Sequence, residues 1–160
     1  MSLLLLTLAV AVVFIFTTGA SMPPIVASHF VAGGAANGFM PRDDYLHVML
    51  ALSAGLPLLL AVLGSITSRM PAGFINLPNR DYWLAPEREA DTLSHLRKLG
   101  YRFGIILAVF LCFVHWLVVK ANAHNPPVFP ESIFFVGMAA FVVWLIVSLG
   151  GFVAHFRRIP

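Results

Sequence analysis

The hydrophobic residues of the chain fall into four long runs, and every Asp, Glu, Lys and Arg lies in the segments between or beyond them. The runs cover residues 3–20, 45–66, 103–119 and 132–154. An α-helix of about 20 apolar residues crosses a hydrocarbon core about 30 Å thick. We therefore predict an all-α integral membrane protein with four transmembrane helices, forming a single membrane domain over residues 1–160.

The first run also has some features of a cleaved signal peptide, because residues 18–20 (Thr-Gly-Ala) resemble a cleavage site. However, no Lys or Arg precedes the run, and its apolar stretch is at the long end for a signal core. We interpret it as a retained helix. Residues 1–66 then form the first helix, an outer loop and the second helix.

Small residues and one proline suggest how the helices pack. Pro57 lies inside the second run and removes the hydrogen bond to the carbonyl four residues earlier, so we expect a kink there. Ala51 and Gly55, and likewise Gly100 and Gly104, are small residues four positions apart. Such pairs allow two membrane helices to approach closely.

The basic residues predict the orientation. Residues 67–102 and the tail after residue 154 hold eight of the Lys and Arg residues, and the remaining segments hold only Arg42 and Lys120. Because positively charged loops stay in the cytoplasm, we expect both termini to be inside (N-in/C-in) and residues 21–44 to be outside. The expected location is the bacterial cytoplasmic (inner) membrane, as a multi-pass protein.

Composition agrees with a membrane protein and limits the function classes. Hydrophobic residues make up 59% of the chain and charged residues 11%, against about 25% charged in soluble domains. The net charge is only +3 and no basic stripe is present, so a nucleic-acid partner is not expected. Cys112 is the only cysteine and lies in an apolar run, where we interpret it as a small hydrophobic side chain.

The inner loop and its helix, residues 67–102, contain the sequence APEREADTLSHLRKLG at positions 85–100. Acidic residues come first, basic residues come last, and leucines fall on one side. This pattern predicts a short amphipathic helix lying on the inner leaflet before the third span, with a solvated charged linker as the alternative. Four residues are candidate membrane-interface anchors: Tyr82, Trp83, Arg97 and Lys98. Residues 103–160 then hold the last two helices and a basic tail.

The outer loop, SMPPIVASHFVAGGAANGFMPRDD, is too polar to cross a bilayer. Residues 25–30 tolerate β-structure, and the glycines that follow can adopt positive φ, so we expect an ordered loop built as a small hairpin or an Ω-type loop. It is either a structural cap, held by hydrogen bonds of His29 and Asn37, or a recognition surface for a peptide or protein partner.

The same loop resembles a bacterial membrane-protein domain of unknown function, which is shared with the N-terminal part of SdpI-type toxin-immunity proteins. The resemblance covers residues 3–66 and implies that the loop links the first two membrane helices. It also offers immunity against a secreted toxic peptide as an alternative function. The matching positions are Pro24, His29, Phe30, Gly34, Asn37, Gly38 and Phe39.

The histidines of the outer half raise a second alternative. His47 lies near the outer end of the second run and His115 near the outer end of the third. Two histidines on different membrane helices can ligate a haem, and imidazoles together with Asp43 or Asp44 can hold a metal ion. For His115 an interhelical hydrogen bond is the other interpretation.

The chain shows no set of residues suited to catalysis. Ser-His-Asp sets, paired intramembrane carboxylates and phosphate-binding glycine loops are all missing from the sequence, so we expect no enzyme. We predict an interaction protein or accessory subunit of a larger membrane complex, surrounded by the lipid bilayer and acting through its outer loop. The predicted partner-binding residues are His29, Phe30, Asn37, Phe39 and Arg42. A haem- or metal-binding subunit and an immunity protein remain as alternatives.

Overall fold

The computed structural model describes residues 1–159 and is helical apart from one small hairpin. Its long helices are α1 (Ser2–Gly19), α2 (Arg42–Leu50), α3 (Leu56–Thr67), α5 (Glu89–Asn122) and α6 (Glu131–Arg157). With α2 and α3 joined, four helical segments of the described chain are long and apolar enough to cross a membrane. This confirms the predicted fold class at the level of four candidate membrane helices.

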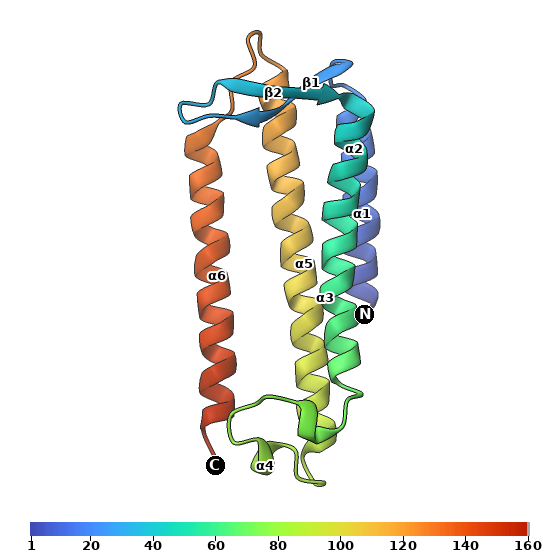
Figure 1. Ribbon diagram of the computed structural model, residues 1–160, viewed down its shortest axis with the longest axis vertical. Coiled ribbons are helices and arrows are strands. Elements are labelled where there is room, and N and C mark those ends of the chain that lie inside the picture. The colour runs from blue at the N-terminus through green and yellow to red at the C-terminus, as the bar shows by residue number, and fades with distance from the viewer. Residues whose placement is uncertain (160) are drawn as a thin grey trace.

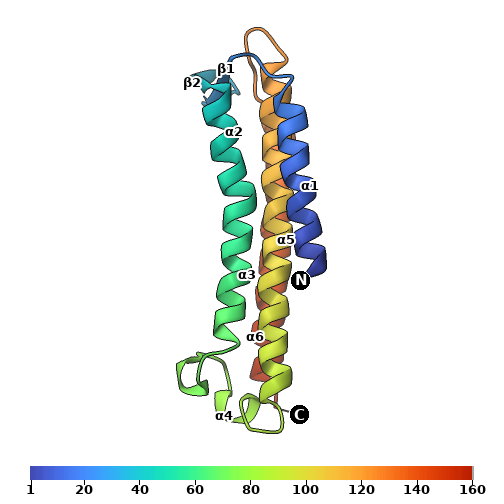
Figure 2. The same ribbon diagram turned by 90° about the vertical axis from the view of Figure 1, so that its right-hand side faces the viewer.

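The four segments run side by side, and the hairpin lies across one end of them (Figures 1 and 2). Both chain ends lie away from the hairpin, and the inner loop with the short helix α4 (Arg80–Trp83) closes the opposite end. The segments α1, α2–α3 and α5 pack against one another, whereas α6 touches mainly α5 (Figure 1). Most of the α6 surface is therefore exposed, as suits a helix that faces lipid.

The contact between α5 and α6 is largely aromatic. Phe110 stacks on Phe141 with ring centroids 4.3 Å apart, and Phe103 meets Trp144 edge-on at 5.1 Å. Near the hairpin, Gly137 leaves room for the ring of Phe113. Because lipid tails are as apolar as these rings, the seam depends on shape and aromatic packing more than on a hydrophobic driving force.

Glycines bring α3 and α5 into backbone contact. A Cβ atom on Gly104 would lie 2.8 Å from the carbonyl oxygen of Pro57, and one on Gly100 would lie 3.2 Å from the Cα atom of Gly64. The expected close packing at Gly100 and Gly104 is confirmed. Gly55 has open space around its Cα atom, so it does not serve the same purpose.

The second span adapts to Pro57 with a π-helical turn, η1 (Ala51–Gly55), that joins α2 to α3. Proline cannot donate to the ladder, and a wider i→i+5 turn lets the helix continue past the missing donor. Ser53 lies in this turn, is fully buried, and its hydroxyl has no hydrogen-bond partner within residues 1–159.

The predicted short helix before the third span is helical, but it is not an element of its own. Its sequence forms the first turns of α5, which runs unbroken from Glu89 to Asn122 into the third span. Leu93 and Leu96 pack against an inner cluster that includes Leu84 and Phe156, so residues of the protein cover part of their apolar side. The inner loop, which supplies Ile75, Leu77 and Leu84 to this cluster, also contains the 3₁₀ turn η2 (Ala72–Phe74).

The outer loop forms an antiparallel hairpin, which confirms the hairpin form of the expectation. Strand β1 (Ile25–Phe30) pairs with β2 (Ala36–Pro41), and β1 carries a bulge between Ala27 and His29. Gly33 and Gly34 turn the chain with φ values of 92° and 79°, which residues other than glycine rarely adopt. In Figure 1 this turn reaches over the outer end of α6.

Candidate functional site

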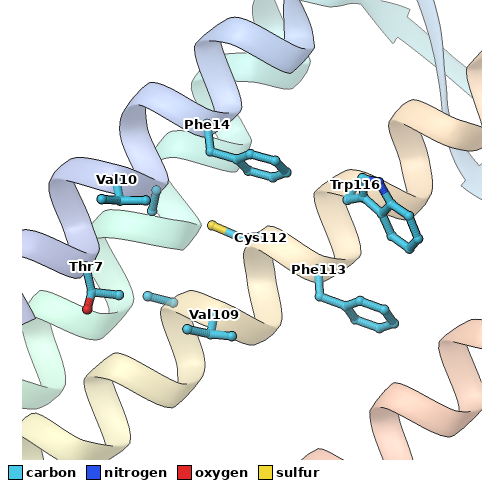
Figure 3. Close-up of a pocket in the computed structure, with 9 residues that line it drawn as sticks. Thr7, Val10, Phe14, Val109, Cys112, Phe113 and Trp116 are labelled. Atoms are coloured by element: carbon cyan, nitrogen blue, oxygen red, sulfur yellow. The ribbon is translucent and has the colours of Figure 1, made fainter.

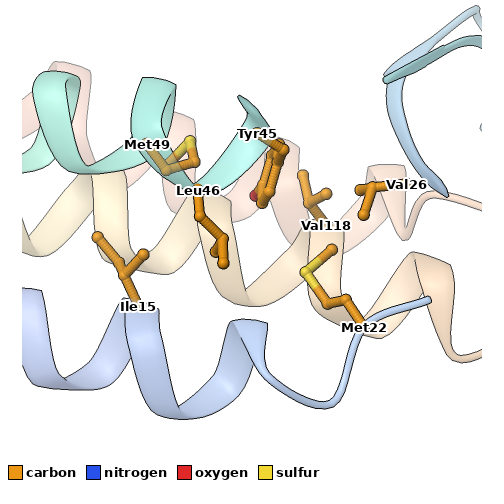
Figure 4. Packing of buried hydrophobic residues seen from close by; sticks show 7 residues of the cluster. All are labelled: Ile15, Met22, Val26, Tyr45, Leu46, Met49 and Val118. Atoms are coloured by element: carbon orange, nitrogen blue, oxygen red, sulfur yellow. The ribbon is translucent and has the colours of Figure 1, made fainter. Parts of the chain in front are cut away.

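A buried cluster fixes the base of the hairpin to the helix bundle. It joins α1, β1, α2 and α5, and Figure 4 shows its side chains converging between these elements. Val26 of β1 is fully buried in it, so this end of the hairpin is part of the protein core. The members are Ile15, Met22, Val26, Tyr45, Leu46, Met49 and Val118.

His115 ties three helices together directly beneath this cluster. The residue is fully buried, with Nδ1 2.9 Å from the hydroxyl of Tyr45 and Nε2 2.9 Å from the hydroxyl of Thr18. Thr18 donates its own proton to the carbonyl of Phe14 at 2.6 Å. Thr18 therefore accepts from Nε2–H of His115, and Nδ1 accepts from Tyr45. The expected interhelical hydrogen bond of His115 is confirmed.

The structure does not bring His47 and His115 together. His47 is exposed on α2, and it follows Tyr45 by two residues, about 200° further around the helix. His115 uses both ring nitrogens within the protein. Within residues 1–159, no three His, Cys, Asp or Glu side chains are grouped to hold a metal ion.

Asn122, at the end of α5, clasps the backbone of β1. Its Oδ1 accepts from the N–H of Ala27 at 2.8 Å, and its Nδ2 donates to the carbonyl of Ala27 at 2.9 Å. Nδ2 also donates to the carbonyl of Val118 at 2.9 Å. The amide therefore occupies the outer edge of β1 as a neighbouring strand would.

The turn of the hairpin is held by the loop between α5 and α6. The carboxylate of Glu131 accepts from the N–H of Gly33 at 3.0 Å with both oxygens, and Phe129 donates its N–H to the carbonyl of Gly34 at 2.8 Å. Phe30 stacks on Phe129 with ring centroids 5.0 Å apart. The two outer loops thus form one unit, and the hairpin connects α6 to the rest of the bundle.

The five predicted partner-binding residues divide into two groups. Phe30 packs inward on Phe129, and Arg42 is half-buried, donating to the carbonyl of Met22 at 3.3 Å. His29, Asn37 and Phe39 are exposed. Asn37 and Phe39 lie two residues apart and so share one face of β2, whereas His29 lies against Gly38 on the opposite face.

The hydrogen bonds that fix the hairpin come from residues that sequence reasoning missed. His29 bonds only to the neighbouring Ser28, at 3.0 Å, and no hydrogen bond of the Asn37 side chain is seen in the described chain. Asn122 and Glu131 supply the long-range bonds instead. Asn122 follows the third apolar run and Glu131 precedes the fourth, so their polar side chains were the available signal for contacts near the hairpin.

The free edge of β2 follows from the clasp on β1. Since Ala27 turns its N–H and C=O to Asn122, its partner Phe39 turns its own main-chain groups away from β1. Within residues 1–159 no further strand pairs with β2. Pro41 lies at the equivalent outward position two residues later, where it offers only its carbonyl group.

The four residues predicted as membrane-interface anchors lie in α4 and in the first turns of α5. Trp83 donates from its indole N–H to the carbonyl of Phe156 at 2.9 Å, so it joins the inner loop to α6. Tyr82 lies under the guanidinium of Arg88, 4.0 Å from the ring centroid. Arg97 and Lys98 are exposed on α5.

An apolar groove between α1 and α5 has a volume of about 270 Å³ and includes Cys112 (Figure 3). Its one hydroxyl, on Thr7, donates back to the carbonyl of Leu3 at 2.8 Å. Because its lining is almost entirely apolar, the groove suits an acyl chain. No protein-family model, no curated protein and no solved structure matches this chain.

Proposed function

We propose that this chain is a non-enzymatic, multi-pass protein of the bacterial inner membrane that binds an extended segment of a protein or peptide partner along β2. The observation that carries this proposal is the unpaired β2 edge of a hairpin whose opposite edge is closed by Asn122. An open strand edge recognises extended peptides through main-chain hydrogen bonds, while side chains provide the specificity.

The side chains along the edge fit this role. Phe39 is 57% exposed, and an aromatic ring beside an open strand edge is a suitable anchor for a partner. Asn37 adds an amide on the same face, and His29 of β1, which lies against Gly38, adds an imidazole on the other face of the hairpin. Because Asn122 and Glu131 already hold the hairpin in place, binding costs little ordering of the platform.

The resemblance of residues 3–66 to the domain shared with SdpI-type proteins also supports this loop as the surface that binds the partner. A secreted peptide and a strand of a larger membrane complex are both partners of the required kind. We do not propose a haem role, because His115 already uses both ring nitrogens for Tyr45 and Thr18.

The orientation that this function needs is N-in/C-in, with the hairpin outside. The support is the basic end of the bundle, which holds eight of the ten Lys and Arg residues. In a Cys112→Ser background, a membrane-impermeant maleimide is expected to label Phe39→Cys in intact cells and to leave Arg97→Cys unlabelled until the membrane is permeabilised. Labelling of Arg97→Cys alone would reverse the orientation and contradict the proposal.

Partner binding should depend on exposed hairpin residues that contribute little to the free energy of unfolding. Phe39→Ala and His29→Ala are each expected to lower recovery of the co-purified partner about tenfold, because each removes a contact worth about 1.4 kcal/mol. Both exposed substitutions should change the unfolding free energy by less than about 0.5 kcal/mol. The measurement is native mass spectrometry after gentle extraction from the cell's own membranes.

Asn125→Ala serves as the matched control, since Asn125 is exposed in the neighbouring outer loop. Its partner recovery should equal that of the unchanged protein. If Phe39→Ala and His29→Ala lose stability and binding in proportion, the hairpin is a structural cap. Unchanged recovery in both variants would also contradict the proposal.

A further inference from the structure

A second pocket lies between α5 and α6 at the basic end of the bundle, far from the hairpin. Its volume is about 340 Å³. Its polar lining is basic or neutral, with no carboxylate, and its deeper wall is apolar. The residues that matter are His95, Arg102, Ser148 and His155, with Trp144 and Phe152.

The positive charge of Arg102 in this pocket has no counter-ion among the described residues. The rings of His95 and His155 are stacked, with an angle of 4° between the ring planes and the centroids 5.1 Å apart. Arg102 lines the same pocket and forms no ion pair with any residue in the described part of the chain. A proton on either imidazole would repel the guanidinium of Arg102, which lines the same pocket, and an anion among the three groups offsets that repulsion.

The pocket is polar at the end with Arg102 and His155, and it is apolar at the end with Trp144. On α6, Trp144 precedes His155 by eleven residues, which corresponds to about 16 Å of helix rise. Arg102 directly precedes the apolar part of α5, and Trp144 packs edge-on against Phe103 just beyond it. A ligand that fills the site therefore has an anionic head at the membrane boundary and an apolar tail beside Trp144.

We propose that this pocket binds an anionic phospholipid, with its phosphate between His95, Arg102 and His155 and an acyl chain along Trp144. Basic pockets between membrane helices are suited to anionic head groups, and a free phosphate would leave the apolar wall unused. The proposal is independent of the hairpin's partner, and it applies to the leaflet that the basic end faces. The lipid fills part of the sparsely packed seam between α5 and α6.

Fluorescence quenching by brominated lipid tests the proposal, because Trp144 lines the pocket. The full chain is placed in phosphatidylcholine vesicles, and dibrominated phosphatidylglycerol or dibrominated phosphatidylcholine is added. The signal is the difference between the unchanged protein and Trp144→Phe, which removes the contribution of the other tryptophans. We expect phosphatidylglycerol to quench Trp144 at a several-fold lower mole fraction than phosphatidylcholine.

Arg102→Gln is expected to reduce this preference about fivefold, since one basic group near a membrane contributes about that factor. Arg97→Gln is the matched control: it removes the same charge from the same helix, but Arg97 does not line the pocket. His155→Gln provides a second test on an exposed residue whose replacement should leave folding intact. Circular dichroism confirms that each variant keeps its helix content.

Equal loss of preference in Arg97→Gln and Arg102→Gln would mean diffuse attraction to the membrane and would overturn the site. Equal quenching of the unchanged protein by the two lipids would overturn it as well. If excess inorganic phosphate abolished the preference at constant ionic strength, the pocket would be a soluble-anion site, and the assignment to lipid would be wrong.

Discussion

Asn122→Leu is expected to release the hairpin from the bundle, at a cost of about 2–4 kcal/mol. The substitution removes all three hydrogen bonds of the amide and leaves the N–H and C=O of Ala27 without partners. Ala27 is fully buried, and each buried polar group without a partner costs about 1–3 kcal/mol. The hairpin can open while the helices stay together, so the loss should be local.

Hydrogen exchange of the hairpin amides measures this effect directly. Exchange at Val26 and Ala27 should accelerate in Asn122→Leu by about a hundredfold or more, as the loss of about 2.7 kcal/mol implies. Asn37→Ala is the control, since this exposed asparagine of β2 should leave the exchange rates unchanged. If Asn122→Leu exchanged as slowly as the unchanged protein, the clasp would not be what holds β1.

His115→Leu is expected to lower the unfolding free energy of the bundle by about 2–4 kcal/mol. Leucine has a similar volume, but it removes two interhelical hydrogen bonds, each worth about 0.6–1.7 kcal/mol in a membrane. It also leaves the buried hydroxyl of Tyr45 unpaired, which adds to the loss. The effect should be global, because His115 joins α5 to both α1 and α2.

A double-mutant cycle with Tyr45→Phe separates the hydrogen bond from packing. Because Tyr45→Phe removes the orphaned hydroxyl, the double variant should be less destabilised than the sum of the two single variants, by about 1 kcal/mol. Unfolding in detergent or bicelles gives the four free energies. His47→Leu, at an exposed histidine of α2, should be neutral. Strict additivity in the cycle would mean that the Tyr45–His115 bond contributes nothing.

The parts of the fold that depend on local sequence could be predicted. Apolar runs located the four membrane helices, since each run alone has the length and composition that a bilayer requires. Gly33 and Gly34 allow the tight turn of the hairpin because their positive φ values suit glycine, and the flanking residues tolerate strands. The close contact of Gly100 and Gly104 with α3 could be predicted because the two glycines are small residues four positions apart.

The parts of the fold that depend on contacts between residues far apart in the sequence could not be predicted. Asn122 bonds to Ala27 across 95 positions of sequence, and nothing near either residue indicates the other. Leu93 and Leu96 at the start of α5 pack against Phe156 of α6, a contact that the local pattern of leucines does not indicate. Phe30 stacks on Phe129 of the other outer loop, and the sequence near either residue does not indicate this contact.

These features together describe an outer platform with one closed edge and one open edge. His115 and the cluster around Tyr45 hold the helices beneath it, and Asn122 and Glu131 hold the hairpin on top. On this platform, within residues 1–159, the β2 edge beside the exposed Phe39 is the strand edge that stays unpaired. We infer that the polar outer segment is conformationally fixed so that β2 is available for recognition.

Photo-crosslinking from position 39 in native membranes tests this central claim most directly. With Phe39 replaced by p-benzoylphenylalanine, we predict one discrete adduct whose added mass is that of a polypeptide, with crosslinks mapping to an extended segment of it. The same replacement at His124, exposed in the neighbouring outer loop, should give no such adduct. No polypeptide adduct at position 39, or equal yields at both positions, would contradict recognition along β2.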